Sequence, residues 1–368
     1  MGRWVGDSAL ELGCLLGCLL VMASATRHVL RASRYVVEGS DRVFSGIQPT
    51  GVVQVGNYLG AVSQWLALQS EVTPGAMYVS VVDLHAMTGA PSGLGGCAVR
   101  TGAMLLAAGV DPDKTVLYVQ SAVKEHAELA WVLGSVTPHG WLGKMTQWKD
   151  KTASGAPRVL GLFSYPVLQA ADILLYNANL VPVGEDQVQH IELARDIASR
   201  MNSVYGTQIE LPRVLLDDTA PRIMSLNDPS SKMSKSNPLD RSRLNMDDSR
   251  DVIAAKIRKA PTDSERGIWY DEEARPNVAS LLRLFAALGK RSVDDVVAQV
   301  GDYTTSQFKD ALTEEAAGVI DPIREEYLRL VDSDLGYVER VLAEGGERAR
   351  VVAAEGMRGV MDAVKNKR

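Results

Sequence analysis

Short apolar runs alternate with helical stripes over the first half of the chain. A strand buried on both faces of a parallel sheet carries few polar residues, whereas apolar residues three or four positions apart mark one face of a helix. We therefore predict strands over 43–47, 78–83, 115–120 and 180–183, and helices over 58–69, 99–108 and 188–201. Strands and helices in this order favour parallel βαβ units.

From about residue 247 onward the strand pattern disappears. Apolar stripes predict helices over 252–259, 278–288, 293–300, 307–331 and 335–365. Gly289 and Ser292 are typical helix caps, and we expect Pro322 to break or kink the fourth of these helices. The chain is therefore predicted to be an α/β protein with a parallel sheet, followed by an all-helical part after a connecting loop at 221–243.

Residues 1–42 form an N-terminal extension of different character. The uncharged stretch 12–26 is shorter than the ~20 apolar residues that a membrane span needs. Residues 23–25 resemble a signal-peptide cleavage site, and the three arginines that follow without an acid are typical of a transit peptide. Two acids nearer the start weaken a simple mitochondrial presequence. We expect a targeting sequence, with a mis-assigned start as the alternative.

Composition narrows the class of protein. A length of 368 residues suggests roughly two or three domains, and 46% hydrophobic with 23% charged residues is typical of a globular protein. The net charge of −6 gives no overall basic character, although a local patch is enough to bind nucleic acid. Three cysteines cannot build a disulfide framework, and no Cys–His cluster has the spacing of a zinc site.

Two distant segments carry the strongest chemical signal. Residues 232–236 (KMSKS) set two lysines three positions apart in a loop that can bring positive charge to a polyphosphate. Residues 44–51 (FSGIQPTG) lead into Gly56-Asn57, where a predicted strand meets a predicted helix. Helix N-termini bind anions, and glycine allows a nucleotide to approach the backbone. Each segment alone is equally consistent with an ordinary loop, so joint action requires a fold that brings them together.

Two weaker phosphate-binding patterns are set aside. Residues 93–98 fit the pattern G-x-G-x-x-A, but they do not directly follow a strand, so we predict a flexible loop there. Gly143-Lys144 is followed by Met145 rather than by serine or threonine, which excludes a P-loop.

A third group of polar residues lies in the middle of the chain. Helical spacing in 165–176 (YPVLQAADILLY) places Gln169 and Asp172 on one face. Burying Asp172 among apolar neighbours is costly unless a ligand or partner donates to it, and a helix cap or a surface acid is the alternative. Residues 181–187 (VPVGEDQ) lie where a strand ends and a helix begins, the edge at which α/β sheets bind ligands. His190 suits a helix surface as well as a ligand site.

Together, five ordered blocks resemble the class I aminoacyl-tRNA synthetases, and among them the tryptophan-specific enzymes of bacterial or organellar type. The blocks are 44–51, 56–60 (GNYLG), 165–172, 181–187 and 232–236, and the resemblance extends from residue 42 to the C-terminus. It implies a Rossmann-type catalytic domain over 43–222, then a signature-loop linker and a helical domain for the tRNA anticodon over 223–368. It also implies a homodimer.

The resemblance implies a reaction in two steps. The carboxylate of L-tryptophan attacks the α-phosphate of ATP and releases pyrophosphate, and a ribose hydroxyl of tRNA(Trp) then takes the aminoacyl group. ATP and Mg²⁺ are the implied cofactors, with the metal held mainly by the ATP phosphates and no metal site on the protein. Such a transfer needs positioning and charge neutralisation rather than a protein nucleophile.

The family's motifs assign roles to residues of this chain. The implied catalytic residues are Lys232, Lys235, Asn57 and Lys149. The implied ATP-binding residues are Gln48, Gly56, Asn57, Gly184, Asp186, Gln187, Ile223, Met224, Lys232, Met233, Ser234 and Lys235. The implied tryptophan-binding residues are Phe44, Gly46, His85, Tyr165, Gln169, Asp172, Val181, Val183 and Gln187. In this set Asp172 would accept the indole N–H, while Tyr165 and Gln187 would hold the amino group.

Two residues depart from the family pattern. Gln54 stands where the first signature normally begins with His or Thr; it keeps a hydrogen-bond donor, so we expect activity at a normal or reduced rate. Gln169 stands where some members carry Met, and it would either contact the indole or only pack beside it.

Three other functions compete with this interpretation. A tyrosine-specific synthetase has a related fold, but residues 170–172 and 184–187 favour tryptophan. A silent paralogue that only binds tRNA is disfavoured because both signature lysines are present. A nicotinamide-dependent oxidoreductase depends on the weak glycine pattern alone. For location we expect the mitochondrial matrix, with the plastid stroma or, without targeting, the cytoplasm as alternatives, and no membrane association after processing.

Overall fold

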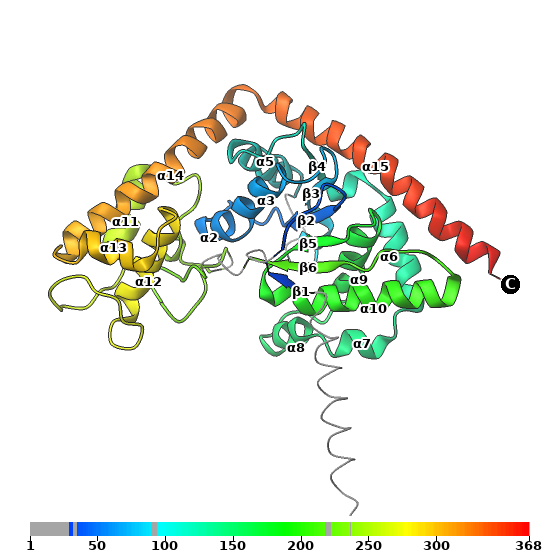
Figure 1. Cartoon of the computed structure of the whole chain (residues 1–368), viewed down its shortest axis with the longest axis horizontal. Helices are drawn as coiled ribbons and strands as arrows, with labels where there is room; N and C mark the ends of the chain where they lie inside the picture. Colours follow the sequence, from blue (N-terminus) through cyan, green and yellow to red (C-terminus); the bar gives the residue numbers. More distant parts are fainter. Residues whose placement is uncertain (1–28, 32–34, 90–93, 218–221, 236, 368) are drawn as a thin grey trace, which may run out of the picture.

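A six-stranded parallel sheet lies at the centre of the computed structural model, which describes residues 29–31, 35–89, 94–217, 222–235 and 237–367 (Figure 1). The strands are β1 (Val29–Arg31), β2 (Val43–Ile47), β3 (Met77–Val81), β4 (Thr115–Val119), β5 (Leu180–Pro182) and β6 (Arg213–Leu216). Their order is β1-β6-β5-β2-β3-β4, and each pairing is parallel. From β2 the chain continues to β3 and β4 on one side, and it then forms β5 and β6 on the other side of β2. The Rossmann-type switch point therefore lies between β2 and β5.

Each face of the sheet packs against its own apolar core. In β2, Val43 and Ile47 enter one core and Phe44 enters the other. In β3, Val79 faces the first core and Tyr78 faces the second. Side chains on a strand alternate between the two faces, so a strand covered on both sides is apolar throughout. This explains why the four strands predicted from apolar runs are found.

Helices connect the strands and cover both faces. They are α2 (Val55–Asn57), a π-helical turn (Tyr58–Val62), α3 (Ser63–Leu68), α4 (Asp83–Ala86), α5 (Leu94–Ala107), α6 (Glu125–Val136), α7 (His139–Gly143), α8 (Thr146–Ala153), α9 (Leu160–Leu174) and α10 (Val188–Tyr205). Helices α3 and α5 supply the first core, whereas α6, α9 and α10 supply the second. The predicted helix at 58–69 is thus found, but its first turns are π-helical.

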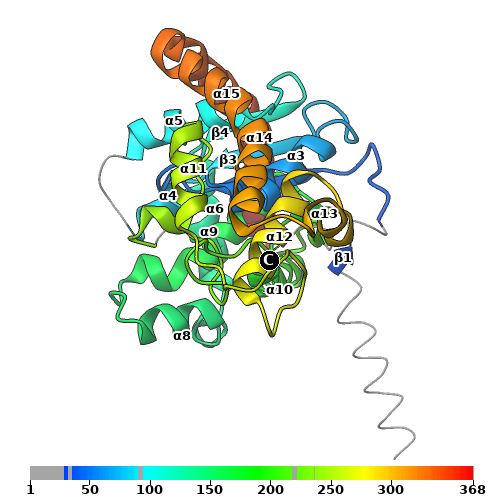
Figure 2. The same cartoon turned by 90° about the vertical axis from the view of Figure 1, so that its left-hand side faces the viewer.

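The second half of the chain is helical, as predicted. Its helices are α11 (Arg250–Lys259), α12 (Pro276–Leu288), α13 (Val293–Val300), α14 (Thr305–Ser333) and α15 (Leu335–Asn366). When the helical part faces the viewer, α11, α12 and α13 lie around α14 in front of the sheet (Figure 2). The long helix α15 then returns across the α/β half, where it packs on β4 (Figure 1).

Several expectations from the sequence are wrong. Helix α14 continues through Pro322, so the break is wrong, while the kink stays a prediction; Ile320 and Ile323 on either side are buried in the first core and hold the helix in place. Residues 94–98 are not a loop but the first part of α5, while Gly93 lies outside the described residues. Strands β1 and β6, which pair with each other at one side of the sheet, were not predicted.

Part of the predicted extension belongs to the folded α/β half. Strand β1 pairs with β6, and the Tyr35 hydroxyl donates to Asp41 at 2.9 Å. The Arg213 guanidinium in β6 donates to the Tyr35 oxygen at 3.0 Å. Residues 1–28 and 32–34, with the cleavage-like site at 23–25, lie outside the described residues. None of the helices in the described part of the chain has both the length and the apolar character of a membrane span.

Candidate active site

A cavity of about 270 Å³ lies where β2, β3 and β5 end. All of the residues predicted to bind tryptophan line it, namely Phe44, Gly46, His85, Tyr165, Gln169, Asp172, Val181, Val183 and Gln187. The lining also contains Gln48 from the predicted ATP set, and it contains Ser45, Val82, Thr88, Gln147, Lys151 and Ile173, to which the sequence analysis gave no ligand role. The cavity therefore sits at the carboxyl edge of the sheet beside the switch point, where α/β folds bind ligands.

Asp172 is the buried acid of this cavity. Its carboxylate is 1% exposed and accepts hydrogen bonds from three side chains. His126 Nδ1 donates to Oδ1 at 2.7 Å, His85 Nε2 donates to Oδ2 at 2.9 Å, and Gln120 Nε2 lies 2.8 and 2.9 Å from the two oxygens. Burial alone would raise the pKa of Asp172. The electrostatic attraction of His126 and His85 and their hydrogen bonds to the carboxylate outweigh burial and lower the pKa to about 2. Asp172 is therefore an ionised acceptor at neutral pH.

A row of hydroxyl groups supports the carboxylate from behind. The Tyr118 hydroxyl donates to the Tyr176 oxygen at 2.8 Å, and the Tyr176 hydroxyl lies 2.9 Å from His126 Nε2. While His126 Nδ1–H donates to Asp172, its other ring nitrogen, Nε2, lies between the hydroxyl groups of Tyr118 and Tyr176. Tyr118, His126 and Gln120 are fully buried and do not line the cavity. These residues come from separate elements, β4, α6 and the turn after α9, so no motif or spacing connects them along the chain.

The Tyr165 hydroxyl is fixed at another wall of the cavity. It donates to Gln147 Oε1 at 3.1 Å and lies 2.9 Å from His190 Nε2. His190 is 1% exposed, so it is not the helix-surface residue that its sequence position allowed. Burial lowers the pKa of His190 to about 4, and burial together with Asp186 raises the pKa of Tyr165 to about 12. Both groups are neutral at pH 7, and His190 Nε2–H can donate to the Tyr165 oxygen.

Two glutamines line the same cavity between α9 and the turn before α10. Gln169 Nε2 donates to Gln187 Oε1 at 3.2 Å. Gln187 Nε2 in turn donates to Asp186 Oδ2 at 2.7 Å. Gly184 precedes this turn, and a Cβ atom there would lie 2.9 Å from Asp186 Oδ1. Gln169, one of the two residues that depart from the family pattern, is thus a polar residue of the cavity lining, and Gln187 holds its side chain.

The two signature segments, far apart in the chain, meet in the fold. Met224 and Lys232 form an antiparallel bridge, and the Met233 N–H donates to the Ile223 carbonyl at 3.0 Å. From the other segment, Gln54 Nε2 donates to the Met233 carbonyl at 3.2 Å. The loop is therefore attached directly to the segment that begins α2.

The polar groups of this junction differ in exposure. Asn57 Oδ1 is buried without a hydrogen-bond partner in the described part of the chain. Lys232 is exposed, whereas Lys235 is partly buried and lines a second cavity of about 540 Å³ with Thr50 and Gly51. Burial lowers the pKa of Lys235 to about 8. Ile223 and Met233 are buried in the first core, so only their backbone faces the junction.

The structure separates the two lysines of helix α8. Lys149 is exposed and does not line the cavity. Lys151 lines it, with Nζ 4.9 Å from the centre of the Tyr165 ring. Residues two positions apart lie on different faces of a helix, so the sequence motif alone did not distinguish them. The role of Lys149 remains a prediction, and Lys151 is the lysine of α8 at the cavity.

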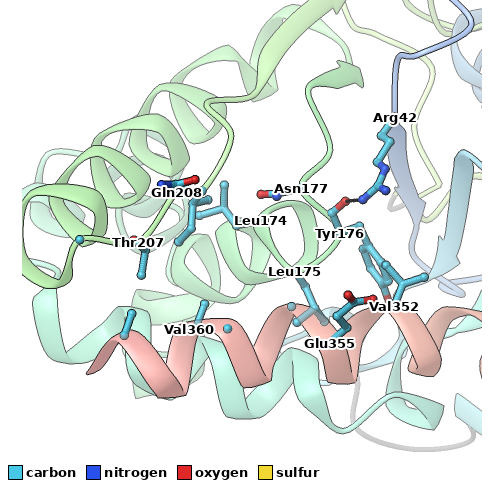
Figure 3. Close-up of a pocket in the computed structure, with 15 residues that line it drawn as sticks. Arg42, Leu174, Leu175, Tyr176, Asn177, Thr207, Gln208, Val352, Glu355 and Val360 are labelled. Carbon is cyan, nitrogen blue, oxygen red and sulfur yellow. Dashed lines mark hydrogen bonds between the residues drawn. The ribbon is translucent and has the colours of Figure 1, made fainter. Parts of the chain in front are cut away.

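A third cavity, of about 490 Å³, lies between α15 and the segments that follow α9 and α10 (Figure 3). Val352, Glu355 and Val360 of α15 line one side, and Arg42 donates to the Tyr176 carbonyl on the other. Arg42 precedes β2, so this cavity is at the amino edge of the sheet. None of the predicted site residues lines it. In the described residues, no group of three or more His, Cys, Asp or Glu is placed to hold a metal ion.

Comparison with known proteins bears on the same site. The family model described as tRNA synthetases class I (W and Y) matches residues 38–319. The tryptophan--tRNA ligase of Rickettsia conorii is 45% identical over 317 residues, with 85% of this chain and 95% of the relative covered. That of Agrobacterium fabrum is 43% identical over 347 residues, with 88% and 97% covered. A solved structure of tryptophanyl-tRNA synthetase from Campylobacter jejuni with ADP and tryptophan has a TM-score of 0.77 at 32% identity, covering 88% of this chain and 99% of that one.

Proposed function

The chain belongs to the class I tRNA synthetases for tryptophan and tyrosine, and we propose that the cavity around Asp172 and the loop of Lys232 and Lys235 are the two halves of its active site. It is an aminoacyl-tRNA ligase that joins L-tryptophan to tRNA(Trp) through a tryptophanyl-adenylate at the expense of ATP. The observation that carries the assignment of the site is the single cavity lined by all of the predicted tryptophan residues.

The first step forms a bond between the tryptophan carboxylate and the α-phosphorus of ATP and breaks the bond to pyrophosphate. Lys232 and Lys235 neutralise the charge that develops on the leaving pyrophosphate, and Lys151 adds charge from the cavity side. Gly56 and Asn57 begin the helix that borders the nucleotide, as their place in the first signature of the family implies. In the second step a ribose hydroxyl of the tRNA attacks the acyl carbon, and AMP leaves.

Selectivity for tryptophan depends on the Asp172 carboxylate. His85 lines the cavity, whereas Gln120 and His126 hold the carboxylate from outside it. The indole N–H therefore donates to Asp172 from the cavity side, beside His85. Tyr165 and Gln187 hold the amino group of the substrate. A site that binds its ligand through a buried hydrogen bond strongly rejects an analogue that lacks the donor.

ATP is bound by the backbone and by the lysine loop. Gly184, Asp186 and Gln187 border the nucleotide on the cavity side, and Met224 with Ser234 borders it on the loop side. We propose Mg²⁺ as the metal, held mainly by the phosphates of ATP. Its contribution is to neutralise phosphate charge during the first step.

Exchange of labelled pyrophosphate into ATP tests the proposed function. The purified chain is assayed with tryptophan, with tyrosine or with neither amino acid. We expect exchange with tryptophan only. Exchange with tyrosine alone would overturn the specificity, and no exchange at all would indicate a silent tRNA-binding protein.

We also propose a homodimer in an organelle. Large apolar side chains are exposed on α6 and at the start of α9, where Trp131 is 83% and Leu160 is 77% exposed, and such residues favour a protein interface. The predicted targeting extension supports delivery to the mitochondrial matrix, with the plastid stroma or the cytoplasm as alternatives. Because β1 is part of the sheet, removal of a presequence would end before Val29.

A further inference from the structure

Gln54, the departure from the first signature of the family, is buried at the junction of the two signature segments. Its side chain is 3% exposed, although it precedes a helix at the edge of the active site. The backbone around it is held by the linker, because the Val55 N–H donates to the Leu244 carbonyl and the Met246 N–H donates to the Val53 carbonyl, each at 2.9 Å. A polar side chain in such a position needs partners for both ends of its amide.

Both ends of the Gln54 amide are bonded. Oε1 accepts the Gly56 N–H at 2.6 Å and thereby caps the helix that carries Asn57. Nε2 donates to the Met233 carbonyl at 3.2 Å, in the middle of the lysine loop. A Cβ atom on residue 56 would lie 2.9 Å from Gln54 Oε1, so glycine at this position makes room for the amide. One uncharged group therefore connects the helix start to the loop.

The chemistry of the amide explains why glutamine can replace the usual residues here. Threonine offers an acceptor for the cap, but its side chain is too short to reach the loop as well. Histidine has an acceptor nitrogen and an N–H donor in its neutral form, but it loses the acceptor when it is protonated. Glutamine supplies one acceptor and one donor at any pH near neutrality.

We propose that Gln54 is a positioning residue for formation of the adenylate, which fixes the loop of Lys232 and Lys235 relative to Asn57. This inference rests on the proposed function, because the lysines act on the pyrophosphate of ATP. Gln54 does not line the tryptophan cavity. Its loss therefore affects the use of ATP and leaves the binding of tryptophan unchanged.

The substitution Gln54→Glu isolates the bond to the loop. Glutamate keeps an acceptor for the Gly56 N–H, but it presents a second oxygen to the Met233 carbonyl in place of the donor. In the ligand-free protein, hydrogen exchange of the peptide that contains the Met233 N–H should accelerate about tenfold, which corresponds to the loss of one buried hydrogen bond. Gln54→Thr should do the same, and Gln54→His should retain protection above the pKa of the new histidine.

Gln69→Glu is the matched control. Gln69 is also buried, at 8% exposure, and its Nε2 donates to the Gly109 carbonyl at 3.0 Å while Oε1 accepts the Asp111 N–H at 3.0 Å. The same chemical change is thus made away from the loop. We expect Gln69→Glu to lower the melting temperature without changing hydrogen exchange of the loop.

Kinetics test whether the link matters for the reaction. In tryptophan-dependent pyrophosphate exchange, Gln54→Glu should lower kcat/KM for ATP about tenfold and leave KM for tryptophan unchanged. Gln54→His should restore most of the loss at pH 8, where its ring is neutral. The proposal is overturned if Gln54→Glu and Gln54→Thr both keep the wild-type hydrogen exchange of the loop and the wild-type kcat/KM for ATP. It is also overturned if Gln69→Glu changes both quantities as much as Gln54→Glu does.

A different result would overturn the proposed function. If the wild-type chain shows no tryptophan-dependent pyrophosphate exchange, the proposed function is wrong, and hydrogen exchange of the loop still decides whether Gln54 holds the loop.

Discussion

At the scale of the residue, burial sets the charge of the groups that act in the site. Asp172 stays ionised because donors surround it, and its pKa of about 2 lies below the ordinary value of 3.8. The unfolded chain therefore takes up the proton first as the pH falls. The stability that these hydrogen bonds give is complete above about pH 4 and is lost as the pH falls through about 2.

Asp172→Asn should impair recognition of tryptophan. Asparagine removes the charged acceptor, and a hydrogen bond to a charged group contributes about 1.5–3 kcal/mol, so kcat/KM for tryptophan should fall roughly 10- to 150-fold. Asp41→Asn is the control, since Asp41 is also buried and accepts from Tyr35 and Asn179, but at the amino end of β2. Steady-state pyrophosphate exchange measures both variants, and equal losses would contradict the role of Asp172.

Lys235 should limit activity at alkaline pH. Its ammonium has a pKa of about 8 in place of the ordinary 10.5, so the free enzyme loses this positive charge as the pH rises through about 8. The value of kcat/KM for ATP should fall over the same range, because this ratio reports the ionisation of the free enzyme.

Lys235→Arg provides the control for that prediction. Arginine stays charged up to a pH above about 12, so the alkaline fall should move upward or disappear. A pH profile of kcat/KM for ATP that is identical in both proteins would show that another group is responsible.

At the scale of the element, helix α15 is the piece that joins the helical part to the sheet. It crosses β4 so closely that a Cβ atom at Gly345 would lie 1.9 Å from the Leu117 carbonyl oxygen. Glycine at this position lets the helix backbone touch the strand. At Gly359 in the same helix, by contrast, no atom lies within 4 Å of an added Cβ.

Gly345→Ala and Gly359→Ala should have opposite effects on stability. The first forces α15 away from β4 and should cost about 1–3 kcal/mol, as overpacking does. The second improves helix propensity and should gain about 0.5–1 kcal/mol. Urea denaturation followed by circular dichroism measures both. A neutral Gly345→Ala would mean that α15 does not rest on β4 in solution.

At the scale of the whole molecule, the proposed homodimer can be tested through the apolar residue Trp131. Trp131 projects from α6 with 83% of its surface exposed. If α6 forms the interface of a homodimer, Trp131→Arg should shift the protein toward the monomer in sedimentation velocity, because a buried aromatic anchor typically contributes at least 2 kcal/mol to binding. Trp269→Arg, at a residue 41% exposed in the helical part, should leave the assembly unchanged. Two variants with equal mass distributions would place the interface elsewhere.

The sequence by itself determined the class of fold and the family of the chain. Doubly buried strands and helical stripes have periods that can be read directly, so β2 and α13 have the predicted bounds. Three of the motif blocks, 44–51, 165–172 and 181–187, also contain most of the residues of the tryptophan cavity, whereas Thr88, Gln147 and Lys151 lie outside all five blocks.

The tertiary structure alone decided which side chains of those blocks face one another. Asp172 is held by His126 and Gln120, which no spacing connects to it, and Lys151 rather than Lys149 lines the cavity. The contact between Gln54 and Met233 joins segments on different elements. Periodicity reports which face of an element is apolar, but it carries no information on the partner that packs there. Distances between polar groups of different elements are therefore fixed only when the cores on both faces of the sheet have formed.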